Sequence, residues 1–413
     1  MTELYELEER AERLVLVGVA VGDEVTAQDS LTELAELVQT AGGLPVGQFI
    51  QNRAGFDIAT YIGSGKVAEL KQYLIMMDAD GIVCDDELTP SQMNNLEREL
   101  EVKILDRTMV ILDIFAARAS TREGKIQVEL AQLRYRSTHL IGMGGILSRQ
   151  GGGIGTRGPG EKQLEIDRRV IRERISRLKA DLEQVKTNRA TQRKQRLDNG
   201  IPVVCIVGYT NAGKSTLLNT LTDSEVLSED KLFATLDPTT RSLELPDGQK
   251  ILLTDTVGFI RKLPHHLIQA FRSTLEEAKY SDYILHVVDA SNPQMDIQMH
   301  TVYAALRDLE IEGRPILTAF NKTDRENVPE VLKDFRADEV YRISARTGDG
   351  LQELLQGISR MIRENRIYFE HVYPYRDAAK IARVRQSGQV IEEVYREDGI
   401  LIRAYVDKRG NYV

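Results

Sequence analysis

The glycine loop at residues 208–215, GYTNAGKS, restricts the possible folds of this chain more than any other feature. It matches the spacing G-x-x-x-x-G-K-[ST] in full, and it stands between an apolar run, IPVVCIVG, and a helical stretch at 214–222. A strand, a loop of bare backbone and a helix N-terminus in this order form a phosphate cradle. Lys214 would reach the β- and γ-phosphates, and the Ser215 hydroxyl would be a ligand of Mg²⁺.

The motif DTVG, residues 255–258, ends a second apolar strand candidate downstream of this loop. Asp255 there can hold Mg²⁺ through water, and the Gly258 N–H can meet the γ-phosphate. Strands and helices alternate from residue 200 to 366, which predicts a doubly wound α/β domain around the loop.

A third motif, NKTD at 321–324, follows another apolar strand and indicates which base is bound. Asp324 can accept hydrogen bonds from guanine N1–H and from its amino group, which adenine does not offer. Burying that carboxylate without these donors would cost about 1–3 kcal/mol. Ser344 and Ala345, after the last strand, would support the base through backbone contact. The motifs in this order predict a GTP-specific enzyme.

A segment rich in threonine, FATLDPTTR at 233–241, lies between the loop and DTVG. A threonine in this position is expected to close on Mg²⁺ when the γ-phosphate is present. Thr235, Thr239 and Thr240 all compete for that role, and spacing alone does not choose among them.

Two positions depart from the commonest pattern. Phe259 follows Gly258 where many GTPases carry a glutamine that orients water, so we expect slow intrinsic hydrolysis that a bound partner raises. Asn211 either helps to bind K⁺ near the phosphates or only braces the loop; rates in KCl and in NaCl would separate these two hypotheses.

The first 107 residues alternate between strand and helix patterns, which predicts a small α/β domain. Ser30 is expected to cap a helix at 30–43, and Thr89 before Pro90 to open one at 89–100. The stretch IGSGK at 62–66 resembles the end of a phosphate loop, but the first glycine is missing and no Ser or Thr follows Lys66. We interpret it as a turn that opens a helix. The expected strands are 13–20, 45–51, 81–86 and 102–106, and a further helix is expected at 65–77, between the two helices named above.

Residues 108–199 have a long helical pattern that is interrupted by a glycine-rich stretch, GGGIGTRGPGEK at 151–162. Gly153, Gly155 and Gly158 spell G-x-G-x-x-G, but a dinucleotide site needs a strand just before it, and helical sequence lies on both sides here. We therefore predict an antiparallel helical hairpin with these glycines at its tip. From Arg118 to Asn199 there are 19 Lys and Arg against 9 Asp and Glu, a net charge of +10 that leaves −19 for the rest.

The bulk composition excludes several classes of protein. At 413 residues with 42% hydrophobic content, the chain is long enough for two to four globular domains. The two cysteines, Cys84 and Cys205, lie in strand-like runs, so no disulfide framework is expected. No apolar run is long enough to cross a membrane, and the acidic start MTELYELEER does not suit a signal peptide. We expect a monomeric cytoplasmic protein, in which residues 367–413 form a third small α/β unit.

The combination of GYTNAGKST, FATLDPTTR, DTVGF and NKTD, behind TYIGSGKVAEL and GGIGTRGPGEKQLEIDRR, closely resembles the HflX family of ribosome-associated GTPases. The resemblance covers nearly the whole chain, and the stretch from the glycine tip into the helix is its most specific part. It implies that Thr235 is the Mg²⁺-binding threonine. It further implies binding to the large ribosomal subunit, with the arm's tip reaching the peptidyl-transferase region, and GTP-dependent splitting of stalled ribosomes under stress. Members of the family are also associated with ATP use.

The resulting fold prediction is a P-loop GTPase domain (200–366), preceded by a small α/β domain (1–107) with a long antiparallel helical hairpin (108–199) and followed by a small C-terminal α/β unit (367–413). Lys214, Thr235 and Gly258 are expected to act in catalysis, with Ser215 and Thr235 as Mg²⁺ ligands. The tip residues expected to contact rRNA are Arg149, Gly153, Gly155, Arg157 and Gly158. The expected nucleotide-binding residues are Gly208, Tyr209, Thr210, Asn211, Ala212, Gly213, Lys214, Ser215, Thr216, Phe233, Ala234, Thr235, Leu236, Asp237, Asp255, Thr256, Val257, Gly258, Asn321, Lys322, Asp324, Ser344, Ala345 and Arg346.

Two other functions remain open from the sequence. A GTPase that assists ribosome assembly or an RNA-modifying enzyme would need a second cofactor or a catalytic cysteine, and neither terminal unit shows nucleophile or metal spacing. A pure interaction protein would use the arm as a coiled-coil docking surface. Salt-dependent binding of ribosomes by the basic arm would distinguish the switch from the interaction protein.

Overall fold

The structure is a computed structural model, and it describes residues 10–147, 159–198, 201–222, 232–233, 235–264, 267, 277–311 and 313–407. The chain divides into two compact units. The first unit comprises residues 1–182 and 262–270, and the second comprises 183–261 and 271–413. Among the described residues, no helix combines the length and the apolar character that a membrane span requires.

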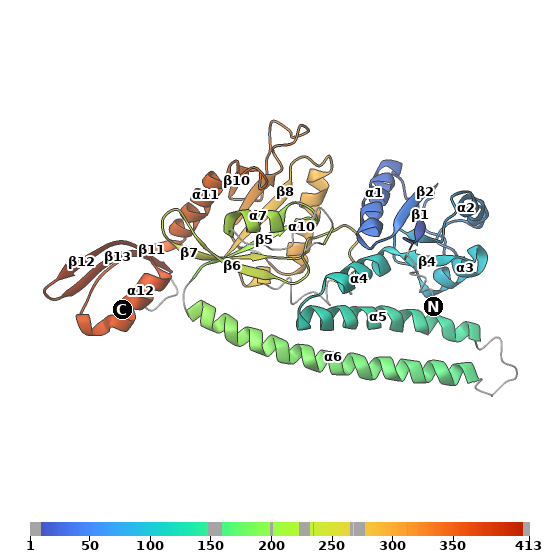
Figure 1. Cartoon of the computed structure of the whole chain (residues 1–413), viewed down its shortest axis with the longest axis horizontal. Coiled ribbons are helices and arrows are strands. Elements are labelled where there is room, and N and C mark those ends of the chain that lie inside the picture. Colours follow the sequence, from blue (N-terminus) through green and yellow to red (C-terminus); the bar gives the residue numbers. More distant parts are fainter. Residues whose placement is uncertain are drawn as a thin grey trace, which may run out of the picture. The chain divides into compact units, whose positions relative to one another are not determined.

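A four-stranded parallel sheet in the order β2-β1-β3-β4 forms the centre of the first unit (Figure 1). The central strand β1 is buried over nearly its whole length, as expected for a parallel strand with both faces covered. Leucines of α2 and α3 pack on one face of the sheet. The elements are β1 (Arg13–Ala20), α1 (Glu24–Thr40), β2 (Leu44–Asn52), α2 (Ser64–Met76), β3 (Gly81–Cys84), α3 (Pro90–Leu100) and β4 (Lys103–Asp106).

The helix starts agree with two of the three predictions made for this unit. Thr89 caps α3 with a complete capping box, and IGSGK indeed forms the turn into α2, with Gly63 at the N-cap. The prediction for Ser30 was wrong, because α1 begins six positions earlier and is capped by Asp23. Ser30 is instead a buried residue inside the helix, where its hydroxyl donates to Asp85.

The helical hairpin is present, but its first arm is broken. The structure divides it into α4 (Arg107–Arg118) and α5 (Arg122–Leu147), because the Thr121 hydroxyl accepts from the Gly124 N–H and starts a new helix. Helix α5 packs against α6 (Pro159–Asp198). Ile126 and Leu130 of α5 share a core with Leu178 and Leu182 of α6, and the two helices run antiparallel (Figure 1).

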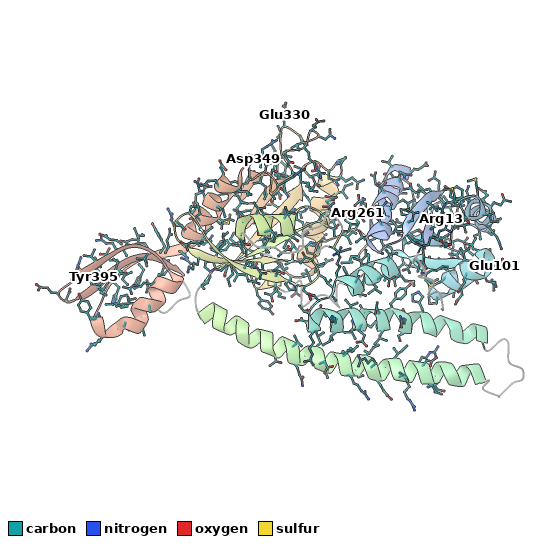
Figure 2. The ribbon with its side chains drawn as sticks, viewed as in Figure 1. Arg13, Glu101, Arg261, Glu330, Asp349 and Tyr395 are labelled. Carbon is teal, nitrogen blue, oxygen red and sulfur yellow. The ribbon has the colours of Figure 1, made fainter. Side chains whose placement is uncertain are left out.

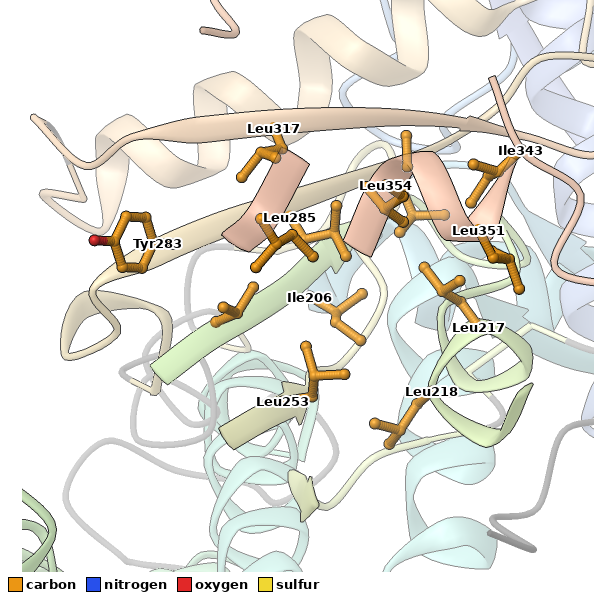
Figure 3. Packing of buried hydrophobic residues seen from close by; sticks show 14 of the residues in the cluster. Ile206, Leu217, Leu218, Leu253, Tyr283, Leu285, Leu317, Ile343, Leu351 and Leu354 are labelled. Atoms are coloured by element: carbon orange, nitrogen blue, oxygen red, sulfur yellow. The ribbon is translucent and has the colours of Figure 1, made fainter. Parts of the chain in front are cut away.

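The second unit contains a six-stranded sheet in the order β10-β9-β8-β5-β7-β6, in which only β6 is antiparallel to its neighbour. Leucines of α7 and α11 cover one face, where they meet Ile206 and Leu253 of the sheet (Figure 3). Met299 of α10 packs on the opposite side of β8 and β9. The elements are β5 (Val203–Gly208), α7 (Lys214–Thr222), β6 (Thr239–Glu244), β7 (Lys250–Asp255), β8 (Tyr283–Asp289), α10 (Met295–Asp308), β9 (Ile316–Asn321), β10 (Glu339–Arg342) and α11 (Leu351–Glu364).

The last part of the chain forms a strand, a helix and a hairpin, in agreement with the small α/β unit predicted from the sequence. The three strands form an antiparallel sheet in the order β11-β13-β12, and Gly399 begins the returning strand of the hairpin. Ile381 and Val384 of α12 cover one face of this sheet. Tyr395 of β12 is exposed (Figure 2). The elements are β11 (Arg366–Tyr373), a short 3₁₀ turn (Tyr375–Asp377), α12 (Ala378–Ser387), β12 (Gln389–Arg396) and β13 (Gly399–Asp407).

Candidate guanine-nucleotide site

The glycine loop leaves β5 at Gly208 and enters α7 at Lys214, at the carboxyl edge of the sheet next to its central strands. Parallel α/β sheets bind ligands in this position, where the strand order reverses. The loop needs glycine at Gly213, where φ is +92° and a Cβ would lie 2.2 Å from the amide nitrogen of Asn321. The backbone N–H groups at the start of α7 are therefore available to phosphate oxygens.

Lys214 is a buried lysine, with 7% of its surface exposed. Its ammonium donates to the Tyr209 carbonyl at 2.7 Å. Burial lowers the pKa of Lys214 to about 8, and the nearby Asp255 carboxylate opposes that shift only in part. The lysine is thus held in a site where phosphate groups would supply the missing negative charge.

Three oxygen-bearing side chains meet at the end of β7. The Ser215 hydroxyl donates to Asp255 Oδ2 at 2.7 Å, and it also lies 2.7 Å from Thr235 Oγ1. Asp255 is completely buried, and burial raises its pKa despite the charge of Lys214. Its other oxygen, Oδ1, has no hydrogen-bond partner among the described residues.

The three threonines that spacing could not separate lie in different places. Thr235 contacts Ser215, whereas Thr239 and Thr240 begin strand β6. The Thr240 hydroxyl pairs instead with that of Thr254 on β7, at 3.0 Å.

Gly258 is packed against the phosphate loop. A Cβ at this position would lie 2.8 Å from the Thr210 Cα and 2.9 Å from the Lys214 Nζ. The next residue, Phe259, binds the same loop through its backbone: its N–H donates to the Gly208 carbonyl at 3.1 Å and its carbonyl accepts from the Thr210 N–H at 2.8 Å. The residue after the DTVG motif is therefore hydrogen-bonded to both ends of a short segment of the glycine loop.

The two motifs expected to bind the base also lie together. The Asn321 amide donates to the Ala212 carbonyl at 2.8 Å and accepts from the Ala345 N–H at 2.9 Å, so it joins the phosphate loop to the last strand's loop. The Ser344 hydroxyl donates to Asp324 at 2.7 Å and thereby lowers the pKa of that carboxyl. Asp324 is exposed, in the loop that follows β9.

The remaining predicted residues differ in their exposure to solvent, and some lie outside the described residues. Thr210, Phe233, Leu236, Thr256 and Val257 are buried around the loop, and Arg346 is exposed beside Asp324. Ala234 and the tip residues Arg149, Gly153, Gly155, Arg157 and Gly158 lie outside the described residues. Asn211, Thr216 and Asp237 are partly buried.

Sequence reasoning missed several contacts of this site. Lys322 makes an ion pair with Asp289 of β8 at 2.7 Å, and the Arg261 N–H donates to the Tyr209 hydroxyl at 2.8 Å. Such pairs have no local sequence signal, since the partners come from separate strands and loops. Both cysteines are buried, and burial raises the pKa of each thiol well above its usual value, so neither is poised as a nucleophile.

Comparison with known proteins places this geometry in a family. Residues 28–116 match the family described as GTP-binding GTPase N-terminal, residues 118–196 the GTP-binding GTPase middle region, and residues 203–322 the 50S ribosome-binding GTPase. A crystal structure of a GTP-binding protein from the archaeon Sulfolobus solfataricus in complex with GDP is 26% identical, covers 84% of this chain and 98% of its own, and has a TM-score of 0.44.

Curated relatives extend over nearly the full length. The GTPase HflX of Lacrimispora saccharolytica is 61% identical and covers 98% of this chain and 96% of its own. The GTPase HflX proteins of Caldanaerobacter subterraneus (49% identical, covering 98% of this chain and 93% of the relative) and Escherichia coli (38%, covering 96% and 93%) are also similar. With these relatives and the phosphate and base motifs assembled on one sheet edge, the chain belongs to the HflX family of GTPases.

Proposed function

We propose that this protein is a GTP-driven switch that binds the large ribosomal subunit and splits stalled ribosomes under stress. The observation that carries the proposal is the meeting of Thr235 and Asp255 at Ser215, directly beside the loop that holds Lys214. Thr235 comes from the segment expected to change with the nucleotide, so the presence of a γ-phosphate would decide whether this contact is kept. Ribosome binding is supported by the family described for residues 203–322.

The site suits Mg²⁺ bound with GTP. Ser215 and Thr235 would be direct ligands, and Asp255 would hold a metal-bound water through Oδ1, the buried oxygen without a described partner. The ion would neutralise charge that develops on the phosphates. Hard oxygen donors of this kind are the ligands that Mg²⁺ prefers.

Each residue of the site has a separate task in hydrolysis. Lys214 supplies positive charge to the β- and γ-phosphates, and the Gly258 N–H meets the γ-phosphate. Asp324 recognises the guanine, and Asn321 keeps the phosphate loop and the base loop in register. Phe259 is buried at 3% exposure and cannot orient water, so hydrolysis by the free protein is slow and a bound partner accelerates it.

A potassium ion would bind near the phosphates through Asn211. This asparagine has a φ of +58°, which places it in the left-handed region. No described residue makes a hydrogen bond with its side chain, which weighs against the bracing hypothesis. The amide oxygen is therefore available to a monovalent cation.

The helical arm would carry the contact with rRNA. Arg172, Arg177 and Lys179 of α6 are exposed, and they belong to the basic stretch of net charge +10. The glycine-rich tip would lay backbone against irregular RNA, and Arg157 would bind phosphate or stack on a base. Because the proposed partner is the ribosome, we propose that the protein acts in the cytoplasm, as a monomer.

Co-sedimentation with purified ribosomal subunits tests this proposal. We expect binding to the large subunit with a non-hydrolysable GTP analogue, weaker binding with GDP, and a steep loss of binding as salt is raised. Arg157→Ala should weaken ribosome binding and leave GTP affinity unchanged. Equal binding in all nucleotide states would contradict the switch.

A further inference from the structure

Two neighbouring carboxylates after β3 receive an ammonium group from a distant part of the chain. The Lys262 Nζ forms an ion pair with Asp85 Oδ2 and lies 2.8 Å from Asp86 Oδ1. Lys262 and Asp85 are 177 positions apart in the sequence. Both belong to the first unit, because residues 262–270 are part of it.

The two carboxylates form a built cation pocket rather than a chance surface pair. Asp85 is 4% exposed in its side chain, and its Oδ1 accepts from the buried Arg107 at 2.7 Å. Burial by itself raises the pKa of Asp85, but the charges of Arg107 and Lys262 outweigh it and lower the pKa below its usual range. Asp86 is held by the hydroxyl of the buried Tyr61 at 2.6 Å. Arg107 and Tyr61 thus hold the two carboxylates in place beside Lys262.

The pocket occupies the position in this sheet where a ligand would be expected. In the order β2-β1-β3-β4, the chain passes from β1 to β2 on one side and then returns past β1 to β3 on the other side. The direction in which successive strands are added to the sheet therefore changes between β1 and β3. Asp85 and Asp86 follow β3 at the carboxyl edge there, and the Asp85 N–H donates to the Val17 carbonyl of β1. Open parallel sheets bind ligands at this kind of edge. Here the chain's own lysine occupies it.

Lys262 is connected to the GTP site by only three residues, Phe259 to Arg261, which follow Gly258. The Phe259 backbone is hydrogen-bonded to Gly208 and Thr210 of the phosphate loop. Lys262 itself has a φ of +54°, a left-handed conformation that disfavours a lysine and persists only where its surroundings impose it. The loop at one end of this segment and the carboxylate pocket at the other provide those surroundings.

We propose that Lys262 is a positioning residue of the GTPase, and that its ion pairs with Asp85 and Asp86 couple the nucleotide state to the first unit. This inference rests on the GTP site proposed above. The ion pairs are present together with the contact of Thr235 and Ser215, which is the arrangement expected with Mg²⁺ and GTP. In this proposal the pairs are kept in the GTP state and weakened in the GDP state, and by linkage GTP stabilises the residues around the pocket.

Four variants of the full-length protein test the coupling. Lys262→Met removes the ammonium and keeps most of the aliphatic side chain, Lys262→Arg restores a cation, and Asp86→Asn weakens the pocket from the other side. The matched control is Lys71→Met, which removes an exposed ammonium paired with Glu101 in the same unit at 2.9 Å. For each protein, affinities for GDP and for a non-hydrolysable GTP analogue are measured by fluorescence titration.

We expect the ratio of analogue affinity to GDP affinity to fall about fivefold in Lys262→Met and in Asp86→Asn, and to recover in Lys262→Arg. The control should match the wild type. In hydrogen exchange, the analogue should protect residues 81–88 more than GDP does in the wild type but not in Lys262→Met. Unchanged ratios in both loss variants, with GDP binding intact, would overturn the coupling and leave the GTP site standing. A wild type that binds neither nucleotide would instead refute the GTP site itself.

If Lys262→Met loses GDP binding through misfolding, Asp86→Asn decides the question alone, since the buried Asp85 and Arg107 remain paired in that variant.

Discussion

The hydroxyl of Ser215 lies 2.7 Å from Thr235 Oγ1, and the same hydroxyl donates to Asp255 at 2.7 Å. The three side chains come from a helix start, a loop and a strand end that are separated along the sequence. Their meeting brings three motifs together at the place where we propose that Mg²⁺ and GTP bind.

Replacement of Thr235 should show whether this threonine is the one that binds Mg²⁺. Thr235→Ala removes a proposed Mg²⁺ ligand that is needed only with GTP, so we expect GTP hydrolysis to fall by at least tenfold while GDP affinity changes little. Thr240→Ala is the matched control, because the Thr240 hydroxyl is bound to Thr254. Hydrolysis is measured in single turnovers across a Mg²⁺ titration. Equal losses in the two variants would contradict the assignment of Thr235.

Guanine recognition should depend on Asp324. In Asp324→Asn the amide places a donor where guanine presents its own donors, so GTP affinity should fall by roughly ten- to a hundredfold, or about 1.5–3 kcal/mol. Xanthosine triphosphate, which carries an acceptor at that position, should bind the variant better than GTP. Asp349→Asn is the control, since this exposed carboxylate accepts from Thr347 (Figure 2). An undiminished preference for GTP in Asp324→Asn would exclude this role.

A side chain at Gly258 should obstruct the γ-phosphate site. The added Cβ in Gly258→Ala would press on the Thr210 backbone and the Lys214 ammonium, at 2.8 and 2.9 Å. We expect affinity for a GTP analogue to drop at least tenfold, more than affinity for GDP, because the γ-phosphate contact is the one displaced. Gly65→Ala in α2 is a control in which the new methyl group meets open space. Titration with both nucleotides measures the effect, and equal drops for the two would mean a general distortion of the loop.

The pKa of Lys214 predicts a pH dependence of nucleotide binding. In the free site this pKa is about 8, so the ammonium loses its proton as pH rises above that value. The negative charge of bound phosphates raises the pKa of Lys214, so above pH 8 the protein must take up a proton when it binds the nucleotide. GDP affinity should therefore fall by up to about tenfold per pH unit above pH 8. Titrations at pH 7, 8 and 9 measure this. Lys214→Met should bind weakly with little pH dependence, and a wild type with constant affinity over this range would contradict the prediction.

Hydrolysis should be faster in KCl than in NaCl if Asn211 helps to hold a potassium ion. The Asn211→Ala variant should lose most of that difference and keep its affinity for GDP, because only the ion contact is removed. Single-turnover rates at constant ionic strength provide the measurement. A rate that is the same in both salts would favour a bracing role for Asn211.

The sequence alone was sufficient for the parts of the site that depend on local backbone chemistry. The glycine loop, DTVG and NKTD could be recognised because a phosphate cradle, a strand end and a base loop each need fixed residue types at fixed spacing. The order of strands and helices also follows from apolar patterns, apart from the start of α1 and the break before α5, where Asp23 and Thr121 supply caps that the periodicity does not show.

Only the tertiary structure brought together residues that share no local pattern. Asn321 connects Ala212 with Ala345 because parallel strands deliver their loops to one edge of the sheet. The contact of Lys262 with Asp85 spans 177 positions, and no periodicity or motif encodes such a distance. A buried carboxylate needs a partner wherever the fold can supply one, and which cation arrives there is decided by packing of the whole chain.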